Sequence, residues 1–295
     1  MAFDRELERE GDAVVSTNEL SVNRVTPAIG AEISNIDLTV PIDQMTHDLI
    51  YDLLIENQVI FFRNQPISSK NHLELACAFG EPEDVHPIYP HVEGFPNIVL
   101  LRNGPESVPD TNDWHTDLTF RQEPPFASVL SAKVVPECGG DTLWLSLSRA
   151  YETLPETIKS ELQTMTAVHD MGSFRNQFAT NEIEGSKIVA AHKEFGSAIH
   201  PIVQTHPVSG KKFLFINESF TAHVVGLRNS ESNRLLNYLF QHINQPEHQA
   251  RFRWTPDSIA IWDNRCTSHY ATADYLPHER VMHRVTVVSD RRLAK

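Results

Sequence analysis

The stretch NDWHTDLTF, residues 112–120, places a histidine and an aspartate two positions apart. Residues i and i+2 of an extended strand project from the same face, so His115 and Asp117 could both reach one metal ion. A distant second histidine would complete the two-histidine, one-carboxylate ligand set of the non-haem Fe(II) oxygenases. The motif alone is weak evidence for a metal site, because a histidine that only makes a structural hydrogen bond near a turn is the commoner case.

The C-terminal part of the chain adds residues that fit the same chemistry. His269 ends an apolar, strand-like segment, and Arg280 and Arg284 follow in RVMHRVT. If residues 280–289 form a strand, both arginines lie on the same face as Met282. An inward guanidinium requires an anion, and its planar fork suits a carboxylate or a sulfonate. The alternative is an exposed strand face with solvated arginines, against which their apolar neighbours argue.

A third fragment, PECGGDTLWLS at 136–146, combines a turn with a hydroxyl group. Gly139 and Gly140 suit a tight turn, and Thr142 opens the following strand. A threonine hydroxyl can donate a hydrogen bond to a carboxylate that an arginine holds. By itself the fragment predicts only a hairpin turn.

Composition and charge exclude several classes of protein. The chain has 295 residues and a formal net charge of −14, which argues against a nucleic-acid or anionic-membrane partner. No apolar run reaches the length of a membrane span, and the charged N-terminus does not resemble a signal peptide. Three widely spaced cysteines indicate neither a disulfide framework nor a zinc knuckle. We therefore expect a cytoplasmic protein.

The elements that must position these residues are predicted from periodicity. Apolar residues at helical spacing predict helices over 42–56, from Ser68 or Ser69 onward, over 148–167 and over 230–245. Most of the rest is strand-like, so we expect a flexible segment over 1–16 and one α+β domain over 17–295. The apolar face of the first helix consists of Met45, Leu49, Ile50, Leu53 and Leu54.

Eight fragments, in chain order, resemble the taurine dioxygenase family of Fe(II)/2-oxoglutarate-dependent oxygenases. This resemblance extends over about residues 25–290, and it implies a double-stranded β-helix (jelly-roll) core with flanking helices. The matching fragments are HPIYPH (86–91), WHTDLTF (114–120), GGDTLW (139–144), THPVSGKK (205–212), FINESFT (215–221), IWDNR (261–265), HYATADYLP (269–277) and RVMHRVT (280–286).

The resemblance also implies roles for single residues. His115, Asp117 and His269 would be the iron ligands, and Arg280, assisted by Thr142, would hold the distal carboxylate of 2-oxoglutarate. Arg284 would face the anionic head group of the substrate, and O₂ would be the oxidant. Trp262 would lie near the iron, although a core aromatic is an equally good interpretation. The implied substrate pocket includes His86, Tyr89, Thr111, Ser173, Phe174 and Phe220.

The implied activity is hydroxylation of the carbon next to the sulfur of taurine or a related small sulfonate, which releases sulfite and an aldehyde along with succinate and CO₂. Thr111 stands where the taurine enzymes have an asparagine, so an alkylsulfate or a small carboxylate is the alternative substrate. The alternatives of another class are a non-catalytic jelly-roll that binds a ligand or metal, and a zinc hydrolase. We expect a homodimer or homotetramer, and residues 169–195 could form a lid or an interaction segment.

Overall fold

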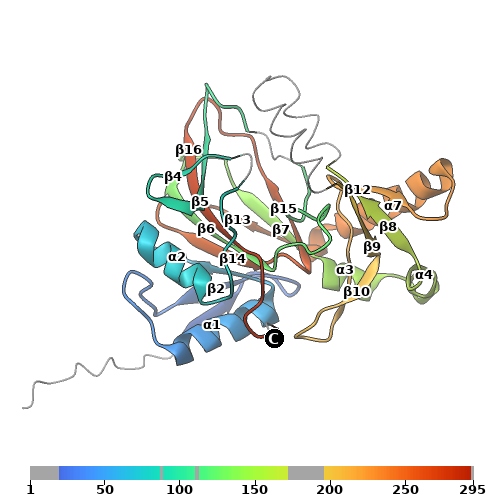
Figure 1. Cartoon of the computed structure of the whole chain (residues 1–295), viewed down its shortest axis with the longest axis horizontal. Helices are drawn as coiled ribbons and strands as arrows, with labels where there is room; N and C mark the ends of the chain where they lie inside the picture. Colours follow the sequence, from blue (N-terminus) through green and yellow to red (C-terminus); the bar gives the residue numbers. More distant parts are fainter. Residues whose placement is uncertain (1–19, 87–88, 110–112, 172–195, 294–295) are drawn as a thin grey trace, which may run out of the picture.

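One large sheet runs through the computed structural model of the chain, which describes residues 20–86, 89–109, 113–171 and 196–293 (Figure 1). Apart from the parallel pair β2–β3, neighbouring strands in this sheet are antiparallel. In spatial order it contains β1 (Ser21–Arg24), β2 (Ala31–Ser34), β3 (Val59–Phe62), β14 (Ile259–Asp263), β6 (Ala127–Val134), β16 (Arg280–Val287), β5 (Phe95–Asn103) and β4 (His91–Val92).

A smaller sheet packs against the large one and closes the core. It consists of β13 (Gln249–Phe252), β7 (Thr142–Ser146) and β15 (Thr267–Ala271). Aromatic side chains from both sheets fill the space between them: Phe61 of β3 stacks on Phe252 of β13 with ring centroids 4.1 Å apart, and Trp144 lies beside Trp262. Such close-packed aromatic pairs hold the two sheets at a fixed separation, and the candidate site lies within that gap.

Two helices cover the outer face of the large sheet, as predicted. α1 (Gln44–Asn57) begins after Asp43, whose side chain accepts from the Thr46 backbone N–H, and α2 (Ser69–Cys77) begins after Ser68. The predicted apolar face of α1 is partly wrong, because Met45 and Leu49 are exposed. Its buried face includes Tyr51, whose hydroxyl donates to the Asp290 carboxylate, so tertiary contacts as well as apolar spacing decide which face is buried.

The single helix predicted over 148–167 is wrong. The chain forms α3 (Leu147–Thr153) and α4 (Glu156–Leu162), and strand β8 (Thr166–His169) follows. Pro155 separates the two helices, since it lacks the backbone N–H that a continuous helix requires and biases Leu154 towards an extended conformation.

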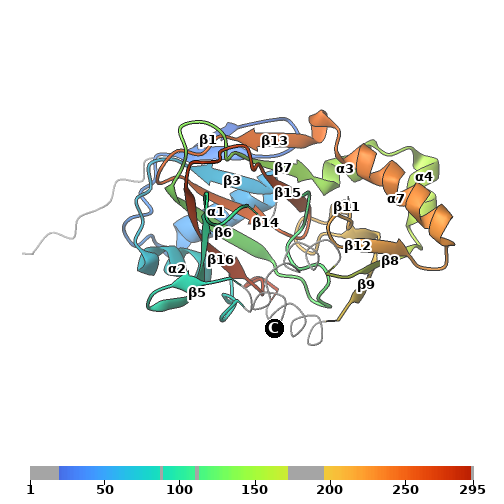
Figure 2. The same cartoon turned by 90° about the horizontal axis from the view of Figure 1, so that it is seen from above.

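The remaining elements gather at the end of the molecule opposite α2 (Figure 2). α7 (Asn229–Ile243) confirms the helix predicted over 230–245. Its N-cap residue is Arg228, whose backbone N–H donates to the Glu231 carboxylate. No helix among the described residues is long and apolar enough to cross a membrane. The elements beside α7 are β9 (Ala198–Pro201), β10 (Val203–Thr205), β11 (Lys212–Leu214), β12 (Thr221–Val224) and the 3₁₀ turn η1 (Pro246–His248).

Candidate active site

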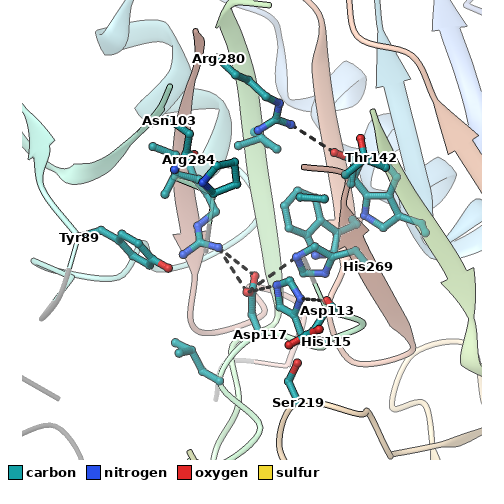
Figure 3. A pocket seen from close by; sticks show the side chains of 18 of the residues that line it. Tyr89, Asn103, Asp113, His115, Asp117, Thr142, Ser219, His269, Arg280 and Arg284 are labelled. Atoms are coloured by element: carbon teal, nitrogen blue, oxygen red, sulfur yellow. Dashed lines mark hydrogen bonds and ion pairs between the residues drawn. The ribbon is translucent and has the colours of Figure 1, made fainter. Parts of the chain in front are cut away.

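A cavity that is partly open to solvent lies between the two sheets (Figure 3). It brings together residues that are far apart in the chain, from the loop that follows β5 and from strands β7, β15 and β16. All five residues that the sequence singled out first line this cavity, namely His115, Asp117, His269, Arg280 and Arg284.

Three of these side chains converge on one point. The Nε2 atoms of His115 and His269 lie 3.8 Å and 3.9 Å from Oδ1 of Asp117, and all three donor atoms lie within 4.8 Å of one another. All three side chains are buried. We call this group the candidate metal triad. Two imidazoles and one carboxylate at these distances form a donor set that suits Fe(II) and leaves coordination positions for other ligands.

The protonation of the candidate metal triad also fits a metal ion. Nδ1 of His115 donates to the Asp113 carbonyl at 2.8 Å, so the lone pair of Nε2 points towards Asp117. Burial, together with the neighbouring His115, holds the pKa of His269 well below its usual range. Burial opposes ionisation of Asp117, but Arg284 and then the two histidines outweigh it and lower the pKa of that carboxyl. Asp117 is therefore a carboxylate and His269 a neutral imidazole, the forms in which these side chains bind a metal ion.

The backbone around the candidate metal triad is hydrogen-bonded to strand β15. The N–H and C=O groups of His115 and His269 bond to each other at 3.0 Å and 2.7 Å, and Thr116 Oγ1 donates to the Thr267 carbonyl. The predicted strand over His115 and Asp117 is limited to this single bridge, because a turn begins at Asp117 and Leu118 has φ +55°. The two side chains converge through this turn rather than through strand alternation.

Arg280 lies at the other end of the cavity, beside Thr142. Its Nε donates to the Gly140 carbonyl at 3.0 Å and its Nη2 to Thr142 Oγ1 at 3.3 Å. The indole N–H of Trp254 also donates to Thr142 Oγ1, at 2.9 Å. Since both neighbours can only donate, the hydroxyl proton of Thr142 remains available for a ligand. Burial lowers the pKa of Arg280 to about 10, and no carboxylate among the described residues forms an ion pair with it.

Arg284 lies between Arg280 and the candidate metal triad along the same face of β16. Its Nη1 is 3.3 Å from Oδ1 of Asp117, and its Nε has no partner among the described residues. Arg280 and Arg284 are buried, so the alternative of an exposed strand face with solvated arginines is wrong. Figure 3 shows both guanidinium groups turned into the cavity.

The remaining walls match the predicted pocket in part. His86, Tyr89 and Phe220 line the cavity, and Trp262 both lines it and belongs to the core. Burial, and then the charge of Arg284, lowers the pKa of His86 to about 3. Thr111, Ser173 and Phe174 lie outside the described residues, as do segment 1–16 and most of the predicted lid over 169–195.

Several lining residues were not predicted from the sequence. Leu118 follows Asp117 directly and Ser219 precedes Phe220, so adjacency to a predicted residue was an available signal for both. Leu101 and Asn103 reach the cavity only because β5 pairs with β16, and no local pattern reveals this pairing.

Comparison with known proteins identifies the family. Residues 21–286 match the family described as taurine catabolism dioxygenase TauD, TfdA family. The chain is 36% identical to an alkylsulfatase of Acinetobacter baylyi, over 93% of this chain and 86% of the relative. It is 35% identical to an alpha-ketoglutarate-dependent sulfate ester dioxygenase of Pseudomonas putida, over 92% of this chain and 90% of the relative. A crystal structure of a taurine dioxygenase from Burkholderia xenovorans superposes with a TM-score of 0.79 at 32% identity, covering 92% and 90% of the two chains.

The chain therefore belongs to the TauD/TfdA family of dioxygenases. The predicted jelly-roll core with flanking helices is confirmed, and so is the class of 2-oxoglutarate-dependent dioxygenase, whose members use Fe(II), 2-oxoglutarate and O₂. The non-catalytic binding protein and the zinc hydrolase are excluded as interpretations of this fold and site.

Proposed function

We propose that this dioxygenase hydroxylates the carbon attached to a sulfonate or a sulfate ester group in a small anionic substrate. One observation carries the proposal: the candidate metal triad and two buried arginines share one cavity, and the carboxylate that Arg284 contacts belongs to the triad itself. Once a metal ion neutralises that carboxylate, two buried positive charges remain to be balanced, and anions are the ligands that do so.

His115, Asp117 and His269 would hold the Fe(II), which supplies the oxidising chemistry of the reaction when 2-oxoglutarate and O₂ are present. Arg280 and the free hydroxyl proton of Thr142 would bind the distal carboxylate of 2-oxoglutarate. Burial removes water from the Arg280 guanidinium and lowers its pKa to about 10. A bound carboxylate would replace that lost solvation, so this environment fits the role.

Arg284 would bind the sulfonate or sulfate head group. Its Nε lacks a partner among the described residues and its Nη1 makes only long contacts to Asp117, at 3.3 Å and 3.5 Å, so the fork can turn to an incoming anion when the metal neutralises that carboxylate. Fixing the head group at Arg284 places the adjacent carbon beside the candidate metal triad and keeps water away from it.

Two types of sulfur-containing substrate are compatible with this arrangement. A small sulfonate such as taurine would yield an aldehyde and sulfite, because the hydroxylated carbon loses its sulfur group. A sulfate ester would yield an aldehyde and sulfate by the same route. The names of the relatives at 36% and 35% identity favour the ester, and so does the apolar wall formed by Leu101, Leu118 and Phe220. A small carboxylate remains the third option.

A substrate panel tests the proposal. The Fe(II)-loaded enzyme is given 2-oxoglutarate and O₂ with taurine, a short alkylsulfonate, a short and a medium-length alkylsulfate, or an aryloxyacetate. Succinate, sulfite, sulfate and aldehyde are then quantified. We expect succinate coupled to sulfite or sulfate release, with alkylsulfates giving the higher kcat/KM. Coupled turnover of only the aryloxyacetate would overturn the sulfur assignment, and no succinate with any compound would overturn the site assignment.

We further propose that the enzyme works in the cytoplasm as a homodimer or homotetramer. The three cysteines are free, which suits a reducing compartment, and the folded chain carries a net charge of −14. Light scattering of the purified protein and fractionation of the source cells are the direct tests.

A further inference from the structure

Asp117 is held in place by a side chain that the ligand set does not include. Asn264 lies directly after β14 and is completely buried. Its Oδ1 accepts from the backbone N–H of Asp117 at 2.9 Å, and its Nδ2 donates to the backbone carbonyl of Asp117 at 3.0 Å. Both backbone polar groups of Asp117 thus bond to one amide side chain, as they would to the opposite residue of an antiparallel strand.

This amide continues the backbone ladder that joins the two histidines of the candidate metal triad. His115 and His269 bond to each other through their backbones, and the side-chain hydroxyl of Thr116 donates to the Thr267 carbonyl next to this pair. At Asp117 the chain turns away into the positive φ of Leu118, a conformation that L-residues rarely adopt, so no backbone rung can follow. The Asn264 side chain fills the position of that missing rung.

Asn264 is itself immobilised, so it can fix the backbone of Asp117. Its backbone N–H donates to the Phe126 carbonyl at 2.8 Å, and its Nδ2 makes a second hydrogen bond, to the Pro125 carbonyl, at 3.1 Å. The backbone N–H of Asp117 can only donate, so the atom that faces it must be Oδ1, and this determines the orientation of the amide. Rotating the amide by 180° would place oxygen against two carbonyl oxygens.

We propose that Asn264 is a positioning residue for the metal site, which holds the Asp117 carboxylate where it can bind the ion. The proposal rests on the metal role proposed above for the candidate metal triad. Without the amide, the N–H and C=O groups of Asp117 lose their partners next to a strained residue. The carboxylate would then be held only by its own longer contacts, to Ser128 and Arg284 at 3.3 Å each. Partners of this kind change metal affinity by about 10- to 100-fold when they are removed.

The test measures metal binding directly, without turnover. The metal-free protein is titrated with Mn(II) by calorimetry, and the visible spectrum of the Co(II)-loaded protein reports the ligand geometry. For Asn264→Ala and Asn264→Asp we expect an Mn(II) Kd that is about 10- to 100-fold higher and an altered Co(II) spectrum. The aspartate keeps the shape of asparagine but places an oxygen against the carbonyls of Asp117 and Pro125. Asn264→Ser retains one acceptor and serves as the variant if the other two do not fold.

Gln65 provides a matched control, because its side chain makes the same pattern of hydrogen bonds elsewhere. Its Oε1 accepts from the Leu38 backbone N–H at 2.7 Å, and its Nε2 donates to the carbonyls of Ile36 and Arg63 at 3.0 Å and 3.1 Å. Gln65 is buried but lies outside the cavity lining of the candidate site. We expect Gln65→Glu to lower the unfolding free energy and to leave the Mn(II) Kd within about two-fold of the unmodified chain.

The outcomes separate this inference from the function on which it rests. If the unmodified chain binds one Mn(II) and Asp117→Ala abolishes binding, the metal site stands. If folded Asn264 variants then bind Mn(II) as tightly as the unmodified chain, the positioning role is wrong. The role is equally wrong if Gln65→Glu weakens binding as much as Asn264→Asp does. If the unmodified chain binds no Mn(II), the proposed metal site itself fails.

Discussion

At the scale of single residues, the two arginines of β16 differ in what surrounds them. Arg280 bonds to a backbone carbonyl and a hydroxyl, whereas Arg284 pairs with the carboxylate of Asp117. This difference assigns them different anions. Arg280 is placed for a carboxylate far from the candidate metal triad, and Arg284 for a head group next to it.

The first prediction separates these two roles by kinetics. Arg284→Ala should raise the KM for the sulfur substrate by at least about 10-fold and leave the substrate-free consumption of 2-oxoglutarate nearly unchanged, because one charge-assisted contact contributes about 1.5–3 kcal/mol. Arg280→Ala should instead raise the KM for the keto acid cosubstrate. Initial rates with each ligand varied in turn check this, and an equal loss for both ligands in both variants would count against the assignment.

The second prediction concerns the turn that supports Arg280. Gly140 has φ +69°, and a Cβ added there would lie 3.2 Å from Cδ of Arg280. Gly140→Ala should therefore raise the KM for the keto acid cosubstrate several-fold, since the guanidinium must shift, and should also cost about 1 kcal/mol of unfolding free energy. Gly210→Ala is the control: it imposes a similar φ of +70° with no atom within 4 Å. An unchanged KM in Gly140→Ala would show that the turn does not position Arg280.

Residue type and spacing singled out His115, Asp117, His269 and both arginines as candidates, and the family resemblance supplied their predicted roles. The structure brings all five into one cavity. Asn264 and Asp113 were not predictable in this way. They act through hydrogen bonds that involve the backbone, and such bonds depend on where distant loops meet. Leu118 contributes a wall of the cavity through its positive φ, which no side-chain pattern indicates.

At the scale of elements, a buried charge network joins the C-terminal segment to the sheet and to α1. Arg265 contacts Asp263 at the end of β14 and Asp290 beyond β16, and the hydroxyl of Tyr51 donates to Asp290 at 2.7 Å. Burial opposes ionisation of Asp263, but Arg265 outweighs it and, together with His206, lowers the pKa of that carboxyl to about 2. His206, Asp263 and Cys266 also lie close together, but Arg265 already neutralises this carboxylate.

The third prediction is that Arg265→Met lowers the unfolding free energy by about 3–5 kcal/mol, because it leaves two buried carboxylates without their cation. Arg102→Met is the matched control: Arg102 pairs with Glu279 at 3.4 Å on the surface, and its loss should cost less than about 1 kcal/mol. Urea unfolding of both variants provides the measurement. Equal small effects would mean that the buried network does not hold the C-terminal segment.

Elements with a strong local signal were predicted well, and those decided by tertiary contacts were not. The helical spacing of apolar residues over 42–56 and 230–245 and the predicted start at Ser68 are local features, and α1, α7 and α2 form at these positions. The helix predicted over 148–167 was wrong because the apolar spacing continued across Pro155, whose backbone effect outweighs periodicity. Strand β16 pairs with β5 and β6, which lie far from it in the chain. A local stretch of sequence therefore could not predict this pairing.

At the scale of the whole molecule, packing of helices and sheets buries histidines that must stay neutral. His72 of α2 is fully buried, and its Nε2 donates to the Val129 carbonyl of β6 at 3.0 Å. Burial lowers its pKa to about 3. His169 of β8 is likewise buried, with its pKa also lowered to about 3 by burial and then by His200. His72 thus links α2 to the large sheet, and His169 bonds through Nδ1 to Thr119 Oγ1 at 2.9 Å. Protonation of either buried side chain opposes folding.

The fourth prediction is that the folded chain loses stability as the pH falls below about 6.5. In the unfolded chain these histidines take up a proton near pH 6.5, whereas in the folded chain they do so only near pH 3. Between those values the unfolded state binds more protons, so the unfolding free energy decreases as the pH falls, by at most about 1.4 kcal/mol per pH unit for each histidine. From pH 7 to pH 5 this amounts to about 2 kcal/mol per histidine.

His72→Gln isolates one of these contributions, since the amide can still donate to the Val129 carbonyl but does not titrate. Its unfolding free energy, measured by urea titration from pH 5 to pH 8, should fall less steeply with acid than that of the unmodified chain, by about 2 kcal/mol between pH 7 and pH 5. His278→Gln, at an exposed position, should leave the slope unchanged. The comparison uses slopes, so a uniform loss of stability from imperfect packing of the glutamine does not affect it. If His72→Gln retained the full slope, the acid sensitivity would have to arise from other groups. The carboxyl of Asp263 is the next candidate, but it contributes only below about pH 4, where it begins to bind protons in the unfolded chain.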